Sequence, residues 1–485
     1  MLFNSFEFFV FFIVVSAAYF LLPFQFRWFF LLLASCVFYM FFVPVYILIL
    51  FFTIVIDYFA GIWIEQASSV QTRKLLLTLS IVANVGVLAV FKYYNFFIDN
   101  IQDVVSLLGY TVQLPLLNIL LPIGLSFHTF QAMSYTIEVY RGNQQAEKHL
   151  GIYALYVMFY PQLVAGPIER PQHIIHQFRQ QHHFDYNRVA SGLRLMLWGL
   201  LKKVLIADRL AVVVEEVYGQ PNAYGGLAVV IATVFFAVQI YCDFSGYSDI
   251  ALGCARVMGF NLMRNFDTPY FAKSIAEFWR RWHISLTSWF RDYVYIPLGG
   301  SRVKASRWYF NLLIVFLLSG LWHGANWTYI LWGGSLGVAL IIEAVTQTQR
   351  KQLELHLPSW LFNSLARIIT LSFICLTWIF FRAESIDHAM QLLHRVFDFK
   401  QEYLYLSQNN LTGTAYLGQP LWRLLGCFFL IASLFTIEAT HKKWNLIAFL
   451  DSLQVGWRWT IYYVLVLLML LFGAFTTSEF IYFQF

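Results

Sequence analysis

Charged side chains are scarce in this chain of 485 residues, of which Asp, Glu, Lys and Arg make up only 12%. Soluble domains carry about 25% charged residues, so the chain has roughly half the usual supply of water-solvated groups. Hydrophobic residues make up 59%, and the mean hydropathy is +0.63. Apolar runs long enough to cross a hydrocarbon core of about 30 Å recur from end to end. The composition excludes an ordinary soluble domain and predicts an integral protein of the lipid bilayer.

Other features are missing as well. The five cysteines are scattered through apolar segments without CxxC spacing, which gives no redox or zinc signal. No basic residue precedes the first apolar run, near 8–22, since Arg27 is the first positive charge. A cleavable signal peptide has its basic region in front, so this run is expected to be a retained helix. The net charge of +6 is too weak to predict a nucleic-acid partner.

The apolar runs predict roughly ten to twelve spans within one integral membrane domain, residues 1–485. Helices are expected because a single span in lipid must satisfy its own backbone hydrogen bonds. The run 114–135 is interrupted by Pro115, Pro122 and Gly124. This predicts a bent or re-entrant element buried in protein.

Basic residues are concentrated between positions 256 and 307. This segment contains nine of them and only three acidic residues, Asp267, Glu277 and Asp292. The positive-inside rule predicts that this region lies on the cytoplasmic side. One interpretation is that these charges only set the orientation of the chain in the membrane. The other is a platform for a polyanionic donor, because arginine forks match phosphate geometry. The candidate donor-binding residues are Arg280, Arg281 and Arg291.

The segment SGLWHGANWTY, 319–329, places a histidine inside a long apolar run. If it is one helix, Ser319, His323 and Asn326 share a polar stripe, and Gly320 with Gly324 forms a GxxxG pair that admits a neighbouring backbone. His323 would then be held in protein, away from lipid. An ionisable residue in a membrane segment is a functional candidate because its burial is costly. A histidine that only links helices by hydrogen bonds is the other interpretation.

The segment EFWRRWHISLTSWFRDYVYIPLGGSR, 277–302, predicts an amphipathic helix at the cytoplasmic surface. Trp282 and Trp289 would anchor it at the interface, and Pro297 with the following glycines would end it. His283 lies in its middle. An anchoring helix without chemistry is equally compatible with this pattern.

Two further polar groups stand out. Asp243 and Asp249 in QIYCDFSGYSDIA indicate an interior cavity or a helix break, or else helix caps. Four histidines, His173, His176, His182 and His183, invite a metal interpretation, but the segment lacks cysteines and a carboxylate set, so no metal site is expected.

WRRWHISLTSWFRDYVYIPLGG, followed by SGLWHGANW with its histidine forty positions after His283, resembles the membrane-bound O-acyltransferase (MBOAT) family. The likeness is greatest to the bacterial branch of alginate and peptidoglycan O-acetylation membrane proteins. PQLVAGPIERP, QIYCDFSGYSDIALG and NFDTPYFAKSIAEFWRRWH match that branch in the same order. The resemblance covers most of the chain and is clearest from about 120 to 385.

The resemblance implies an all-α polytopic fold, a ring of tilted helices around a central tunnel. It implies that His323 is the catalytic base and that His283 is the second motif histidine. It also implies an acyl group, expected to be acetyl, carried by a cytoplasmic thioester such as acetyl-CoA, with no bound cofactor. The acceptor would be an extracytoplasmic polysaccharide such as alginate, reached directly or through a periplasmic acetyltransferase partner. The protein would lie in the bacterial inner membrane. Peptidoglycan O-acetylation is the alternative.

The chemistry of these residues agrees with that implication. Acyl transfer to a hydroxyl needs a base within hydrogen-bond reach, and histidine titrates near neutral pH. Asn326 or Ser319, with Trp322 in the same segment, could orient the imidazole or donate to the developing oxyanion. A transporter or flippase that uses His323 as a proton relay belongs to a different class, and the repeat symmetry typical of transporters is not found in the sequence. A scaffold for a polysaccharide synthase is the third hypothesis.

Overall fold

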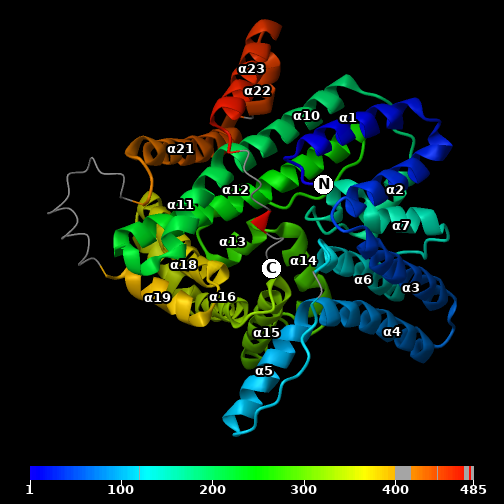
Figure 1. The fold of residues 1–485 in the computed structure, drawn as a ribbon, viewed down its shortest axis with the longest axis horizontal. Coiled ribbons are helices and arrows are strands. Elements are labelled where there is room, and N and C mark those ends of the chain that lie inside the picture. Colours follow the sequence, from blue (N-terminus) through cyan, green and yellow to red (C-terminus); the bar gives the residue numbers. More distant parts are fainter. Residues whose placement is uncertain (119–120, 399–416, 445, 475–479, 482–485) are drawn as a thin grey trace. The chain divides into compact units, whose positions relative to one another are not determined.

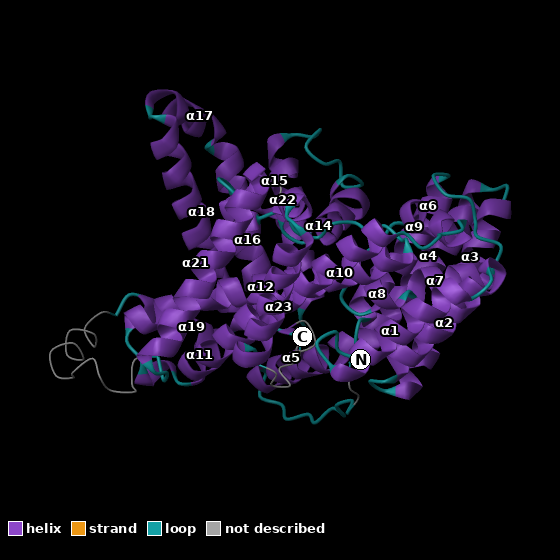
Figure 2. Cartoon of the chain, turned by 90° about the horizontal axis from the view of Figure 1, so that it is seen from above, coloured by secondary structure: helices purple, strands orange, loops and turns teal. Residues whose placement is uncertain are grey.

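The computed structural model describes residues 1–118, 121–398, 417–444, 446–474 and 480–481. Within these ranges the regular secondary structure is helical and contains no strand (Figures 1 and 2). The chain forms two compact units. Unit 1 comprises residues 1–197 and 247–265, and unit 2 comprises residues 198–246 and 266–484. The single domain of residues 1–485 stays a prediction.

Unit 1 is built from the N-terminal helices and the end of α12. Its helices are α1 (Phe6–Leu21), α2 (Phe24–Met40), α3 (Ile47–Gln66), α4 (Val70–Leu88), α5 (Tyr94–Leu107), α6 (Leu125–Arg141), α7 (Leu150–Met158), α8 (Tyr160–Leu163), α9 (Pro171–Ile174) and most of α10 (Tyr186–Leu200). Of the run 114–135, expected to be bent and buried, residues 119–120 lie outside the described residues and 114–118 are non-helical and mostly exposed. Its second part belongs to α6, which begins after Gly124 (φ +76°) and is buried over nearly its whole length. A side chain at position 124 would meet the carbonyl oxygen of Leu163 at 2.9 Å, so this close approach requires glycine.

Unit 2 carries both predicted catalytic histidines. Its elements are η4 (Leu201–Ala207), α11 (Asp208–Gly219), the first part of α12 (Gly226–Met258), α13 (Ile275–Arg281), α14 (Ile284–Phe290), η7 (Arg291–Tyr295), α15 (Ala305–His323), α16 (Trp327–Val345), α17 (Gln347–His356), α18 (Ser359–Arg382), α19 (Ile386–Val396), α21 (Leu421–Trp444), α22 (Leu446–Ser452) and α23 (Val455–Phe472). Helix α16 packs against both α15 and α18, and this group of three helices holds the site described below.

Eight helices of the described residues are long and apolar enough to cross a membrane, and α1 and α2 are shorter apolar helices. Eight is fewer than the ten to twelve spans expected from the runs, because buried elements such as α6 do not qualify, and the two shorter helices would bring the number to ten. Large apolar side chains on these helices are exposed, including Phe6 at 77% and Leu21 at 85%. Exposed apolar surface of this extent is compatible with lipid rather than with water. The chain is an all-α, multi-pass membrane protein.

Glycines set the distance between α15 and α16. A side chain at Gly320 would lie 2.2 Å from the carbonyl oxygen of Tyr329, and one at Gly333 would lie 2.2 Å from that of Phe316. The predicted approach of a second backbone at Gly320 is therefore confirmed, with Gly333 as its counterpart. Gly324 has a different role, because a side chain there would meet the ring of Tyr329 rather than a helix backbone.

This packing gives a testable pair of variants. Gly333→Ala should destabilise the protein by about 1–3 kcal/mol, because the added methyl group forces the two backbones apart. Gly334→Ala is the matched control, since its methyl group would meet only the flexible end of Leu317 at 3.3 Å. The measurement is thermal stability in detergent. Equal melting temperatures for the two variants would contradict the packing argument.

Candidate active site

His323 is the last residue of α15 and is only 4% exposed. The single helix predicted for 319–329 is wrong: the helix stops here, Gly324 is extended, and α16 begins at Trp327. Asn326 stabilises the start of α16, because its side-chain oxygen accepts from the Thr328 N–H at 3.0 Å. Its amide nitrogen donates to the Glu384 carbonyl at 3.1 Å. Ser319 is buried one turn before His323.

The imidazole of His323 is surrounded by aromatic rings. The centroid distances are 4.8 Å to Trp322, 4.9 Å to Trp332 of α16 and 5.4 Å to Phe381 of α18. The Trp332 ring stands at 90° to the imidazole, an edge-to-face arrangement. Trp332 and Phe381 could not be recognised from the sequence, because only the folding of α16 and α18 onto α15 brings them beside His323. These rings exclude water from the imidazole.

The position of His323 at a helix end has an electrostatic consequence. The last carbonyl groups of α15 carry partial negative charge, which favours a cation by about 0.3–1 kcal/mol. An imidazolium formed when His323 accepts a proton would benefit from this field. The geometry suits a residue that takes a proton during a reaction and gives it back.

His283 lies at a break between two short helices, α13 and α14, with left-handed backbone angles (φ 43°, ψ 54°). The continuous helix predicted for 277–302 is therefore wrong. Its proposed interfacial anchors are also core residues, with Trp282 1% and Trp289 4% exposed. A non-glycine residue in this conformation costs roughly 1–3 kcal/mol, and such strain is concentrated at functional sites.

The ring of His283 is completely buried. It packs edge-on against Phe244 at 4.6 Å and lies 6.2 Å from Trp322, which also contacts His323. Burial lowers the pKa of His283 to about 3, so the ring is neutral in the folded protein. The two motif histidines thus share Trp322 as a neighbour, and the segment QIYCDFSGYSDIA reaches this site through Phe244.

Asp243 is held by a buried lysine. Lys203, in the π-helical stretch η4, contacts Asp208 and Asp243 at 2.8 Å each, and all three side chains are at least 93% buried. Asp243 also accepts the backbone N–H of Ile481 at 2.8 Å. Burial opposes the charge on Lys203, but the two carboxylates outweigh it and raise its pKa. Lys203 could not be recognised from the sequence, because its partner Asp243 lies forty positions further along the chain.

The roles expected for the two aspartates need correction. Asp243 and Asp249 both lie within α12, which is continuous from Gly226 to Met258, so they neither cap nor break a helix. Asp243 serves instead as an ion-pair partner in unit 2. Asp249 belongs to unit 1.

The predicted donor-binding arginines are on or near the molecular surface. Arg280 is exposed, Arg281 pairs with Glu277 one turn earlier, and Arg291 pairs with Asp292 at 2.7 Å. Exposed pairs of this kind contribute little to stability. Their guanidinium groups can exchange such a partner for a phosphate, and their role in donor binding stays a prediction.

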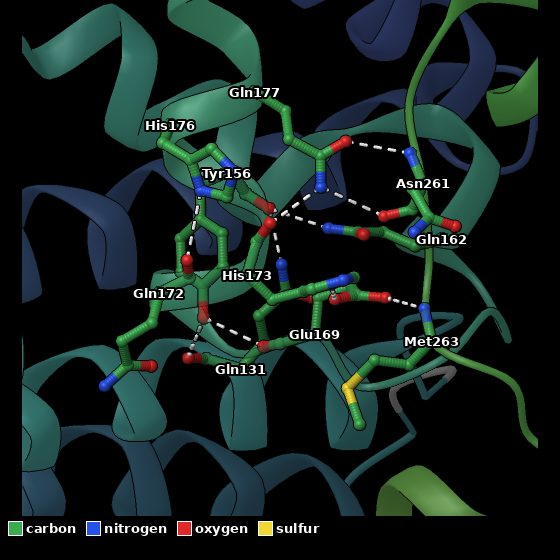
Figure 3. A network of polar contacts seen from close by, with 10 residues as sticks. All are labelled: Gln131, Tyr156, Gln162, Glu169, Gln172, His173, His176, Gln177, Asn261 and Met263. Carbon is green, nitrogen blue, oxygen red and sulfur yellow. Dashed lines mark hydrogen bonds and ion pairs between the residues drawn. The ribbon is translucent and has the colours of Figure 1, made fainter.

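A second polar network lies in unit 1, around PQLVAGPIERP (Figure 3). The buried carboxylate of Glu169 accepts from His173 Nδ1 at 2.7 Å and from the Met263 N–H. The side chain of Gln177 bonds both the N–H and the carbonyl of Asn261, at 2.8 and 3.0 Å. The side chains of Glu169 and Gln177 therefore bind the irregular segment after α12 to the 169–177 segment.

The clustered histidines take part in this network separately. His173 bonds Glu169, His176 bonds the Gln172 carbonyl at 3.1 Å and His182 bonds the Gln177 carbonyl at 3.1 Å. The bond to Glu169 raises the pKa of His173. Within the described part of the chain, no group of three or more His, Cys, Asp or Glu residues is placed to hold a metal ion.

A helical membrane fold with a buried histidine at a broken helix is compatible with a membrane-embedded enzyme, and comparison with known proteins specifies the class. Residues 148–383 match the membrane-bound O-acyltransferase (MBOAT) family. The probable alginate O-acetylase AlgI of Pseudomonas aeruginosa is 40% identical over 417 residues, 85% of this chain and 78% of that protein. The AlgI of Pseudomonas putida is 35% identical over the full length of both chains. The peptidoglycan O-acetyltransferase of Helicobacter pylori is 35% identical over 389 residues, 75% of this chain and 72% of that protein. The chain belongs to the MBOAT family and is a membrane acyltransferase.

Proposed function

We propose that this chain is an O-acetyltransferase of the bacterial inner membrane. It transfers acetyl groups from a cytoplasmic thioester such as acetyl-CoA to an extracytoplasmic polysaccharide such as alginate. The acceptor is the polysaccharide itself or a periplasmic acetyltransferase partner that passes the group on. The names of the relatives from P. aeruginosa and P. putida support the substrate class.

The observation that carries the proposal is the site of His323. Its imidazole is buried among aromatic rings at the end of α15, in a family of O-acyltransferases. In the proposed reaction His323 takes the proton of the acceptor hydroxyl while the oxygen attacks the thioester carbonyl. The tetrahedral species then expels the thiolate, which recovers the proton from the imidazolium. The products are an ester and a free thiol, and the dry surroundings suppress hydrolysis of the thioester.

His283 has a supporting role in this proposal. Burial keeps its ring neutral, so it acts as a hydrogen-bonding group near Trp322 rather than as a charged one. Arg280, Arg281 and Arg291 would meet the phosphates of the donor at the cytoplasmic surface. Asn326 and Ser319 keep the end of α15 in place for His323.

Peptidoglycan is the second candidate acceptor, favoured by the similarity to the H. pylori protein. Both candidates are hydroxyl-bearing glycans outside the cytoplasmic membrane, so the same site serves either one.

The test compares cells that express the chain with cells in which its gene is deleted. Alkali-labile acetyl is measured separately on exopolysaccharide and on purified peptidoglycan. We expect the deletion to remove acetyl from the exopolysaccharide fraction and complementation to restore it. Loss from peptidoglycan alone would select the second candidate, and unchanged acetyl on both polymers would overturn the proposed function.

A further inference from the structure

Three buried tryptophans near the site, Trp279 of α13, Trp332 of α16 and Trp378 of α18, have indole N–H groups that lack an acceptor among the described residues. Trp332, whose ring contacts His323, is 1% exposed, and its neighbour Trp279 is 6% exposed. Their rings are in contact, with a centroid distance of 5.8 Å and an angle of 73°. Buried N–H groups in proteins are nearly always hydrogen-bonded, so an unused pair needs an explanation.

The neighbours of Trp332 do not provide an acceptor. Its ring packs against His323, Phe381 and Trp378, with centroid distances of 4.9, 5.1 and 5.7 Å. Phe381 and Trp378 present aromatic carbon and a second indole donor. The Trp332 N–H has no hydrogen-bond acceptor among the described residues, so it is available to a group that binds beside His323.

The charge balance of the site indicates which kind of group this is. The rings around Trp332 are uncharged aromatics and one imidazole, which is a poor environment for a permanent anion such as a phosphate. An oxyanion that forms as His323 becomes an imidazolium leaves the net charge of the site unchanged. Fixed, neutral N–H donors in a dry site are well suited to stabilise such a transient charge.

We propose that the indole N–H of Trp332 binds the carbonyl oxygen of the acyl donor and stabilises the oxyanion formed there, with Trp279 as the adjacent donor. This inference rests on the proposed function of His323. When the acceptor oxygen attacks, the carbonyl π electrons move onto the oxygen that faces Trp332. When the carbonyl re-forms, the C–S bond breaks, and the thiolate takes its proton from His323.

The test uses the full chain in membrane vesicles, with radiolabelled acetyl-CoA as the varied donor and the cell's own polysaccharide as acceptor. Trp332→Phe keeps an aromatic ring but removes the N–H. We expect kcat to fall about 10²–10³-fold, the effect of deleting one oxyanion donor, with KM for acetyl-CoA unchanged. A wild-type kcat in a folded Trp332→Phe protein would overturn the inference.

Trp378→Phe is the matched control. Trp378 is also 1% exposed, stacks on Trp332 and has an indole N–H without a close acceptor, but this indole lies near the Tyr270 hydroxyl. We expect its kcat to stay within a few-fold of wild type. If Trp378→Phe lost as much activity as Trp332→Phe, the loss would reflect packing, and the inference would fail.

A third replacement removes the remaining ambiguity about ring size. Trp332 exchanged for 3-benzothienylalanine keeps the bicyclic ring and replaces N–H with sulfur. The same loss of kcat is expected, and full activity would overturn the inference even if Trp332→Phe did not fold. His323→Gln, assayed in parallel, separates the two hypotheses. Activity in that variant refutes the proposed base, whereas an inactive His323→Gln beside a fully active Trp332→Phe refutes only the oxyanion donor.

Discussion

His323→Gln should lower acetyl transfer by about 10²–10⁴-fold while the protein remains folded in the membrane. Glutamine fills much of the same space within the rings of Trp322, Trp332 and Phe381 and can hydrogen-bond. It cannot accept a proton at neutral pH, so the general-base step is lost. The measurement is acetyl ester on polysaccharide per unit of membrane-inserted protein, determined over the same time course for each variant.

The control for this variant is His356→Gln. His356 is an exposed histidine on α17 whose ring bonds the Gln352 carbonyl of its own helix at 2.7 Å. We expect wild-type ester formation from it. Ester formation by His323→Gln at the wild-type rate would show that His323 is not the base, and the acyltransferase reaction would need another proton acceptor.

The kinetic constants of His323→Gln distinguish a general base from a transporter residue. A general base acts on the hydroxyl after both substrates are bound, so the loss should be in kcat rather than in KM for acetyl-CoA. A transporter that used His323 as a proton relay would instead lose uptake or export of a carrier. His323→Gln would therefore lose acetyl transfer if the chain is an acyltransferase, and uptake or export if it is a transporter.

The sequence predicted the helical membrane fold because that prediction depends only on local composition. Twenty apolar residues in lipid have few structures available to them, and the segment 305–323 shows this directly. The two motif histidines were found for a related reason, since a histidine within an apolar run is conspicuous. Their roles stay predictions.

The breaks at both histidines were missed because helical periodicity carries no information about them. Between His323 and Trp327, the decisive interaction is the Asn326 cap on α16, a single side-chain bond. At His283 the helix is interrupted by a left-handed residue that local propensity does not favour. In each case tertiary packing overrides the local pattern, as expected at a functional site.

Contacts between segments far apart in the chain also could not be predicted from the sequence. Trp332 and Phe381 reach His323 only after three helices have packed together, and Glu169 finds the Met263 N–H across almost a hundred residues. Of the alternatives considered for Asp243 and Asp249, the helix break and the helix caps are absent, because α12 is continuous through both residues. A carboxylate in an apolar run needs a partner, and nothing in the local sequence showed that this partner was Lys203.

Lys203→Met should destabilise unit 2 by about 3–5 kcal/mol, because it removes the cation from between two buried carboxylates. Asp208 and Asp243 are each 2.8 Å from the lysine nitrogen, in surroundings that provide little solvation. Methionine matches the lysine stem in length, so the loss is electrostatic rather than steric. The measurement is thermal stability of the detergent-solubilised chain by fluorescence-detected size-exclusion chromatography.

The double variant Lys203→Met with Asp208→Asn tests that cause directly. It deletes the cation together with one carboxylate and retains Asp243, which also holds the Ile481 N–H. Removing the second carboxylate ends its repulsion with Asp243, so part of the lost stability should return, although Asp243 stays buried without a cation. Activity should return with it, because Asp243 precedes Phe244, whose ring packs against His283 at 4.6 Å. If the double variant were no more stable than Lys203→Met, the destabilisation would come from the altered packing of η4. In that case the ion pairs would not be what holds this part of α12 beside the candidate active site.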